Sequence, residues 1–184
     1  HCYTKQTDIC IGTPVADRED EDLQSQIGCL INTLAIRSSF NKDSSFLEVL
    51  HNVKQGTLDA FEHKLYPFDM ILQDIQYQRD PARNPLFDFG YTYHESQYLD
   101  EMPDVGDLGI RSEIIAPEVY SVKNDVWFHT SLNNCNLGLT LLYDNRLYQE
   151  NFIHDFIENY RFVTHTLSTR PGIKLKELLL RFSA

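Results

Sequence analysis

"DVWFHTSLNNCNLGLTLLYD", at residues 125–144, has two arms rich in β-branched, aromatic and leucine side chains. Between the arms lie Asn133 and Asn134, a residue type that tolerates the tight backbone of a hairpin turn. The pattern predicts a β-hairpin. A two-stranded hairpin is marginally stable by itself in water, so this stretch also implies a larger sheet.

Four further stretches predict strands of that sheet. "DICIGTPVA" (8–16) and "IGCLINTLAIR" (27–37) are apolar and indicate buried strands, the first running into a loop at Gly12-Thr13-Pro14. "LFDFGYTYH" (86–94) is aromatic and loosely alternating, and "SEIIAP" (112–117) is a shorter candidate. The acidic stretches at 17–22 and 95–111 predict a solvated turn and a loop.

Three helices are predicted from spacing and end signals. Residues 43–63 carry an apolar stripe behind "SFLE" (45–48), which resembles a capping box, and should fray near Gly56. Residues 66–76 begin with Pro67, a residue that suits a first helical turn. From Phe152 the apolar residues recur every three or four positions until Pro171-Gly172 ends the helix. The fold class is therefore α/β, a layered mixed sheet covered by helices.

The net charge of the chain argues against two classes of partner, and its cysteines indicate the redox compartment. The 184 residues carry a formal net charge of −11, which disfavours nucleic acid and anionic lipid. No apolar run approaches the roughly 20 residues that span a bilayer, so we expect no membrane partner. Free cysteines suit a reducing compartment, and we therefore expect a cytoplasmic protein. The cysteines (Cys2, Cys10, Cys29 and Cys135) form no C-x-x-C pair, and Cys10 and Cys29 are predicted to be small buried thiols.

A self-sufficient active site is not visible in the sequence. The seven histidines include no H-E-x-x-H motif, and the pair His154 and Glu158 is better explained by a solvated helix face than by a metal site. The G-x-S-x-G elbow and the two glycine-rich nucleotide signatures are also lacking. We therefore expect no catalytic residue and no metal in this chain itself.

Three segments together resemble condensation domains of nonribosomal peptide synthetases. "IGTPVADR" (11–18) with "IGCLINTLAIR" is similar to the paired family signature I-G-T-P-V-A-G-R and I-G-F-F-V-N-T-L-x-x-R. "HKLYPFDMIL" (63–72) is similar to H-Q-D-x-P-F-E, and "RDPARNPLF" (79–87) to R-D-x-S-R-N-P-L-F. The sequence departs from the family pattern at four places. Asp17 replaces a glycine, and Gln24-Ser25-Gln26 replaces the glutamate, glycine and apolar residue that usually precede the second signature. Cys29-Leu30 replaces two aromatic residues, and Lys64-Leu65 replaces Gln-Asp.

The resemblance implies one lobe of a two-lobed fold of the chloramphenicol acetyltransferase type. Residues 1–184 would be the C-terminal lobe, because the family's His-His-x-x-x-Asp-Gly signature belongs to the first lobe. The implied reaction joins an acyl thioester on one carrier to an amine on a second carrier, with phosphopantetheine arms on the carriers and no cofactor bound directly. The implied partners are the N-terminal lobe, donor and acceptor carrier domains and an adjacent adenylation domain.

The resemblance also suggests where this lobe meets substrate. Asn32 and Thr33 lie on a strand that the family directs toward the substrate tunnel, where Asn32 would offer hydrogen bonds to the pantetheine amides. The alternative is that the Asn-Thr pair satisfies neighbouring backbone. Arg18 would hold the loop at the tunnel floor, and its alternative is a surface ion pair with Asp20 or Glu21.

The segment "RDPARNPLF" is predicted to be a structural latch between a helix and the sheet. Arg79 and Arg83 can each bind a carboxylate or carbonyls in fork geometry, with Asp80 beside them. Pro81 and Pro85 stiffen the turn, and Asn84 can bridge backbone groups. The segment would supply geometry and not catalysis.

Two other functions are compatible with this resemblance. A degenerate lobe would serve as a carrier-docking or scaffold module, and an epimerisation domain lobe would invert a stereocentre. "IGCLINTL" is less similar to the epimerisation branch. Because the sequence opens on His1, we expect a fragment of a longer chain that is inactive by itself.

Overall fold

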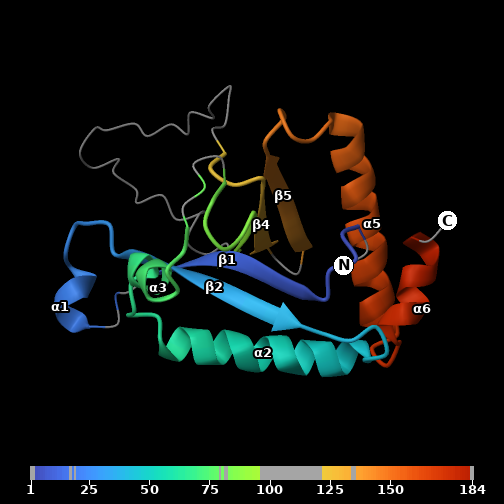
Figure 1. Ribbon diagram of the computed structural model, residues 1–184, viewed down its shortest axis with the longest axis horizontal. Helices are drawn as coiled ribbons and strands as arrows, with labels where there is room; N and C mark the ends of the chain where they lie inside the picture. Colours follow the sequence, from blue (N-terminus) through green and yellow to red (C-terminus); the bar gives the residue numbers. More distant parts are fainter. Residues whose placement is uncertain are drawn as a thin grey trace.

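A five-stranded mixed sheet organises the computed structural model, which describes residues 3–16, 18, 20–78, 80, 83–95, 122–133 and 136–182 (Figure 1). The strand order is β2-β1-β3-β4-β5. The two outer pairs, β1 with β2 and β4 with β5, are antiparallel, whereas the inner pairs are parallel. The strands are β1 (Asp8–Ala16), β2 (Ile31–Ser39), β3 (Phe89–Glu95), β4 (Val126–Asn133) and β5 (Asn136–Tyr143).

The helices have clear local causes. Helix α2 begins after Ser45, whose hydroxyl accepts from the Glu48 N–H at 3.3 Å while the Glu48 carboxylate accepts from the Ser45 N–H at 2.7 Å. This reciprocal capping box satisfies two backbone donors. The helices are α1 (Glu21–Gln24), α2 (Phe46–Glu62), α3 (Phe68–Asp74), α5 (Glu150–Thr169) and α6 (Leu175–Leu179), followed by the 3₁₀ turn η2 (Leu180–Phe182).

Helices α2 and α5 lie over the same face of the sheet. Tyr91 of β3 and Phe128 of β4 are register partners in a parallel pair, so their side chains project to one side. On that side Phe128 meets the α5 rings of Phe156 and Tyr160, with centroids 5.9 and 5.7 Å apart. The side chains of Ile9 and Ile11 share this face and line the space beneath α2.

The C-terminal segment returns to the start of α2. The Phe46 N–H donates to the Ile173 carbonyl at 3.0 Å, and the Leu175 N–H donates to the Ser44 carbonyl at 3.0 Å. Lys176 adds an ion pair with Asp43 at 2.8 Å. Figure 1 shows α6 beside the loop that leads into α2.

Few side chains reach full burial. Among the described residues no side chain is less than 2% exposed, and Val126 is buried to that limit. The buried apolar residues are Val15, Leu34, Phe87, Val126, Ile153, Ile173 and Leu178. They come from elements far apart in the sequence, and most other apolar side chains of the described residues stay partly exposed.

The prediction of a buried strand over residues 27–37 is wrong in two respects. The strand starts at Ile31, and Ile27 is fully exposed at 105%. Among the described strands β2 also lies at the sheet edge, with β1 as its neighbour, and most of its residues stay partly exposed. Cys29 is accordingly exposed and Cys10 is only half-buried, which corrects the prediction of two buried thiols.

Some of the other predicted elements are confirmed, and others differ in their bounds. The hairpin, the strand at 8–16 and the three predicted helices are confirmed, although that strand is only partly buried. Helix α2 passes through Gly56 without a break, and β1 runs on through Pro14 to Ala16. The predicted turn at 17–22 contains the start of α1, capped by Asp20. The strand predicted at 112–117 lies outside the described residues, as does the loop predicted at 95–111 except for Glu95, which ends β3.

Candidate functional site

Arg18, Asn32 and Thr33 lie at the same end of the β1–β2 pair, but their side chains do not form one cluster in the described contacts. In the register Pro14 lies opposite Thr33 and Val15 opposite Asn32. Arg18 lies two positions after Ala16, the last residue of β1. Because side chains alternate along a strand, Asn32 and Thr33 project to opposite faces of the sheet. Asn32 therefore shares the helix-covered face with the buried Leu34.

The Asn32 carboxamide is used completely by backbone partners. Its nitrogen donates to the carbonyls of Lys64 at 2.7 Å and Tyr66 at 2.8 Å. Its oxygen accepts from the N–H groups of Thr33 at 2.9 Å and Phe68 at 3.2 Å. A carboxamide has two donors and two lone pairs, so these four bonds fill its capacity.

This arrangement fixes the turn that joins α2 to α3. Pro67, the N-cap of α3, supplies no capping side chain, and Asn32 takes over that function for the Phe68 N–H. The Tyr66 hydroxyl also donates to Asp74 in α3. The turn presents Leu65, which is 68% exposed, near the strand start at Ile31, which is 62% exposed. Asn32 thus positions an apolar edge at this end of the sheet.

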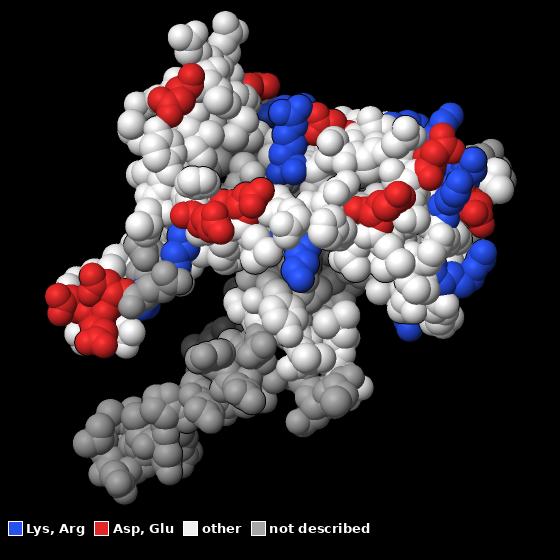
Figure 2. Space-filling model, turned by 90° about the horizontal axis from the view of Figure 1, so that it is seen from below, with Lys and Arg blue, Asp and Glu red and all other residues white. Residues whose placement is uncertain are grey.

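Arg18 organises the loop between β1 and β2. Its guanidinium donates to the carbonyls of Leu23 at 3.0 Å, Gln26 at 2.8 Å and Gly28 at 3.1 Å. A planar fork of N–H groups suits several carbonyls at once. The same loop carries the acidic α1, whose carboxylates gather at one end of the molecule in Figure 2.

The predicted latch is bonded to the segments that lead into β3 and β4. The Arg83 guanidinium donates two hydrogen bonds to the Asp88 carboxylate, from Nε to Oδ1 at 3.3 Å and from a terminal nitrogen to Oδ2. The backbone N–H of Arg83 donates to the Asp80 carbonyl at 3.3 Å. The Asn84 amide donates to the Lys123 carbonyl ahead of β4. Burial raises the pKa of the nearby Asp125 carboxyl, and the Asp88 carboxylate raises it further. Arg79, Pro81 and Ala82 lie outside the described residues.

Phe87 carries the latch into the sheet. Its ring is buried and lies over Gly12, so that a Cβ at Gly12 would come within 2.1 Å of the ring. Leu86 before it has a φ of 69°, which turns the chain inward. The Phe87 ring also meets Phe68 at 5.9 Å. Phe68 therefore connects the α2–α3 turn, which Asn32 holds by hydrogen bonds, with the latch.

An open cleft of about 840 Å³ borders the latch on the α3 side. Asp80, Arg83 and Asn84 form one wall, and Leu72 and Tyr77 belong to the other. The cleft places the predicted latch residues beside solvent, where a partner surface has access to them.

Two histidines far apart in the sequence are neighbours on the sheet. His94 of β3 and His129 of β4 stack with ring centroids 6.2 Å apart and an angle of 10°. Trp127 extends the row at 6.3 Å and donates from Nε1 to the Thr92 hydroxyl at 2.7 Å. Burial lowers the pKa of His129, and the nearby His94 lowers it further. Sequence reasoning missed this pair because the parallel β3–β4 register carries no local signal.

The described residues contain no group of three or more His, Cys, Asp or Glu side chains that would hold a metal ion. In the same part of the chain no helix is long and apolar enough to cross a membrane.

Comparison with known proteins supplies the context. Residues 1–183 match the family model described as Condensation domain. The chain is 31% identical over 179 residues to gramicidin S synthase 2 of Brevibacillus brevis, covering 96% of this chain and 4% of that protein. It is 33% identical over 176 residues to bacitracin synthase 1 of Bacillus licheniformis, covering 96% of this chain and 3% of that protein.

The fold comparison agrees. The X-domain in its complex with OxyB, from teicoplanin biosynthesis, superimposes with a TM-score of 0.83 at 22% identity, covering 96% of this chain and 38% of that chain. At this identity the likeness concerns the fold. The present chain spans only a small share of the curated relatives and well under half of the solved structure.

Proposed function

The chain belongs to the condensation-domain family of nonribosomal peptide synthetases, and from that premise we propose that residues 1–184 form the C-terminal lobe of an amide-forming domain. The observation that carries the proposal is the family match, which spans residues 1–183. The amide-forming activity would belong to the two-lobed domain, and the lobe alone would be inactive.

The reaction would join two building blocks held on carrier domains. The amine nitrogen of the acceptor attacks the thioester carbonyl of the donor, the C–N bond forms, the C–S bond breaks, and the amine proton finally reaches the released thiol. An α-amino group with a pKa near 8 is largely protonated at neutral pH, so the domain gains by placing the neutral amine correctly. Holding both reactants in a shielded passage lowers the barrier without a bound cofactor.

This lobe would contribute walls and not proton transfer. Asn32 would act through the turn that it holds, because its carboxamide bonds are taken by backbone groups. Thr33, on the opposite face, would be the neighbour able to approach a phosphopantetheine arm. Arg18 would shape the floor through the 20–28 loop that it binds. The latch would hold α3 and β1 in register beside this wall.

The partners follow from the same proposal. The N-terminal lobe would complete the passage, and donor and acceptor carrier domains would deliver the phosphopantetheine-bound substrates beside an adjacent adenylation domain. A test is to join the chain to its upstream sequence and incubate the product with two loaded carriers. Amide formation detected by mass spectrometry supports the proposal, and a folded domain that forms no amide contradicts it.

A scaffold function is the second candidate, because Arg18 and Asn32 spend the described hydrogen bonds of their side chains within the lobe. In that case the joined domain would bind carriers without condensing their cargo. Carrier binding measured by calorimetry, together with the amide assay, separates the two candidates. An epimerisation lobe would instead invert a carrier-bound stereocentre, which chiral analysis of the product detects.

A further inference from the structure

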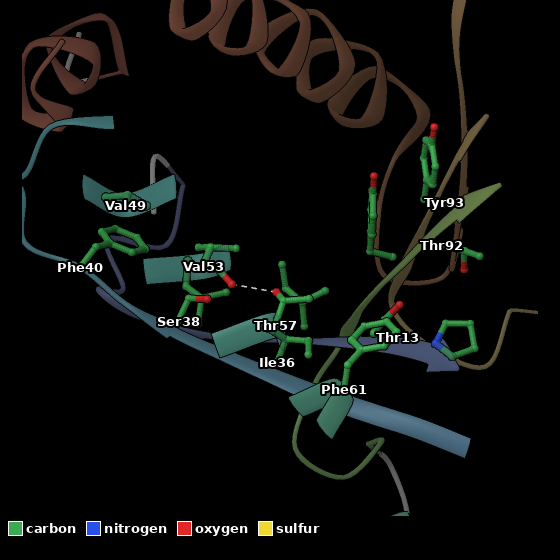
Figure 3. Close-up of a pocket in the computed structure, with 14 residues that line it drawn as sticks. Thr13, Ile36, Ser38, Phe40, Val49, Val53, Thr57, Phe61, Thr92 and Tyr93 are labelled. Carbon is green, nitrogen blue, oxygen red and sulfur yellow. Dashed lines mark hydrogen bonds between the residues drawn. The ribbon is translucent and has the colours of Figure 1, made fainter. Parts of the chain in front are cut away.

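The Phe87 ring lies on the face of the sheet opposite α2 and α5. Thr13 of β1 belongs to the helix-covered face, where it lines the same pocket as Phe61 of α2 (Figure 3). Side chains alternate along a strand, so Gly12 faces the other way, and the β1–β2 register gives Thr33 of β2 the same direction as Gly12. The Phe87 ring, which covers Gly12, therefore shares its face of the sheet with Thr33.

Phe68 makes contacts on both faces at this end of the sheet. Its N–H donates to Oδ1 of Asn32 at 3.2 Å, and the Asn32 side chain belongs to the helix-covered face. Its ring meets the Phe87 ring of the opposite face, with the two centroids 5.9 Å apart. Phe68 is the first residue of α3 and is half-buried, so a single residue joins the two faces across the strand ends.

The Asn32 carboxamide extends this connection to Thr33. Its Oδ1 accepts from the Phe68 N–H and also, at 2.9 Å, from the Thr33 N–H. Because the two donors share one oxygen, a shift of the Phe68 backbone changes a hydrogen bond of Thr33. A continuous chain of contacts thus runs from Phe87 in the latch through Phe68 and Asn32 to Thr33.

Phe68 has more room to move than Phe87. The Phe68 side chain borders the cleft of about 840 Å³ beside the latch, together with Leu72 and Pro85. Phe87 is only 8% exposed and is confined by Gly12 beneath its ring. The fixed Phe87 ring therefore supports the Phe68 ring, and weakening this contact lets the start of α3 shift toward the cleft.

We propose that Phe68 is a positioning residue, which transmits the packing of the latch to Thr33 across the end of the β1–β2 pair. The inference deepens the proposed function and rests on it in one respect, that Thr33 is the residue that approaches the phosphopantetheine arm. The contacts themselves belong to the 184-residue chain. The latch then acts on the wall of the passage through Phe68, in addition to holding α3 beside β1.

Amide hydrogen exchange of the 184-residue chain tests the contacts, with Phe128 on interior strand β4 as the reference amide. Phe87→Leu removes the supporting ring and should speed exchange of Thr33 about tenfold relative to Phe128. Phe68→Leu should do the same, whereas Phe68→Tyr keeps the ring and should leave the ratio unchanged. The matched control Phe61→Leu also removes a ring at this strand pair, on the helix-covered face, and should leave the ratio unchanged.

The double variant separates two routes from the latch to Thr33. If the route passes through Phe68, Phe87→Leu adds nothing in a chain that already carries Phe68→Leu. A route through Gly12 and the β1–β2 register would make the two effects multiply, and that result overturns the proposal. Equal acceleration of Thr33 and Phe128 in the single variants also overturns it, because the loss is then general. If Phe68→Leu prevents folding, Phe68→Met serves in the same comparison.

Amide formation distinguishes this inference from the proposed function. In the joined two-lobed domain, at equal folded fraction, Phe68→Leu should lower kcat/KM about tenfold while Phe68→Tyr retains it. An active domain in which Phe68→Leu forms amide at the unaltered rate overturns the positioning role. A joined domain that shows the exchange coupling but forms no amide contradicts the proposed function alone. An active domain in which exchange of Thr33 does not respond to Phe68 contradicts this inference alone.

Discussion

The side-chain oxygen of Asn32 accepts a hydrogen bond from the Phe68 N–H at 3.2 Å, across 36 residues of sequence. With the bonds to Lys64 and Tyr66, it joins an edge strand to the start of α3. The residue that the family resemblance places at the tunnel is thus also a structural bridge. A loss of activity on changing Asn32 is informative only when stability is measured alongside it.

Asn32→Ala should destabilise the lobe. The change leaves two carbonyls and the Phe68 N–H without their partner, which costs about 2–4 kcal/mol and lowers Tm on the order of 5–10 °C. Thermal melting followed by circular dichroism measures the shift. The control Asn52→Ala alters an exposed residue of α2 and should leave Tm nearly unchanged. Equal melting temperatures of the two variants would show that the hydrogen bonds of Asn32 do not stabilise the lobe.

Gly12→Ala tests the contact beneath the latch. A Cβ at this position would come within 2.1 Å of the Phe87 ring, so the ring must move, at a cost of about 1–3 kcal/mol. Phe87→Leu should recover part of that loss in the double variant, because the shorter side chain leaves room. Gly28→Ala is the matched control, since nothing lies within 4 Å of its added Cβ. Urea unfolding compares the variants, and additive losses at Gly12 and Phe87 would contradict the contact.

Arg83→Ala should lower Tm by releasing Asp88 from its fork and leaving the acidic cluster with Asp125 unbalanced. The Arg83 side chain is largely exposed, so we expect a fall of only a few degrees. Arg161→Ala removes an exposed α5 arginine paired with Glu158 and should have no effect. An unchanged melting temperature for Arg83→Ala would show that the latch does not depend on this ion pair.

Local features of the fold could be predicted from the sequence, whereas features that depend on distant residues could not. Period and end signals predicted the hairpin around Asn133 and the helices, because these patterns are local. They placed Cys29 in a buried strand because an apolar run does not reveal that its strand is at a sheet edge. The roles of Asn32 and Phe87 depend on partners tens of residues away. Long-range register is therefore what sequence reasoning lacked.

The stacked histidines give a pH prediction. Burial first, and His94 second, lower the pKa of His129, so the folded state disfavours the protonated His129 ring. Because its folded pKa is depressed, protonation below that pKa costs stability, and stability should rise with pH through the range between the folded pKa and the ordinary value near 6.5.

His94→Gln should raise the pKa of His129, because it removes the neighbouring positive charge, while burial keeps that pKa below its ordinary value. Imidazole proton shifts followed by NMR across a pH titration measure both effects. His154→Gln, on the exposed face of α5, is the control that should not move the His129 titration. If His129 titrates identically with and without His94, the two rings do not couple electrostatically and the pH dependence of stability must come from burial alone.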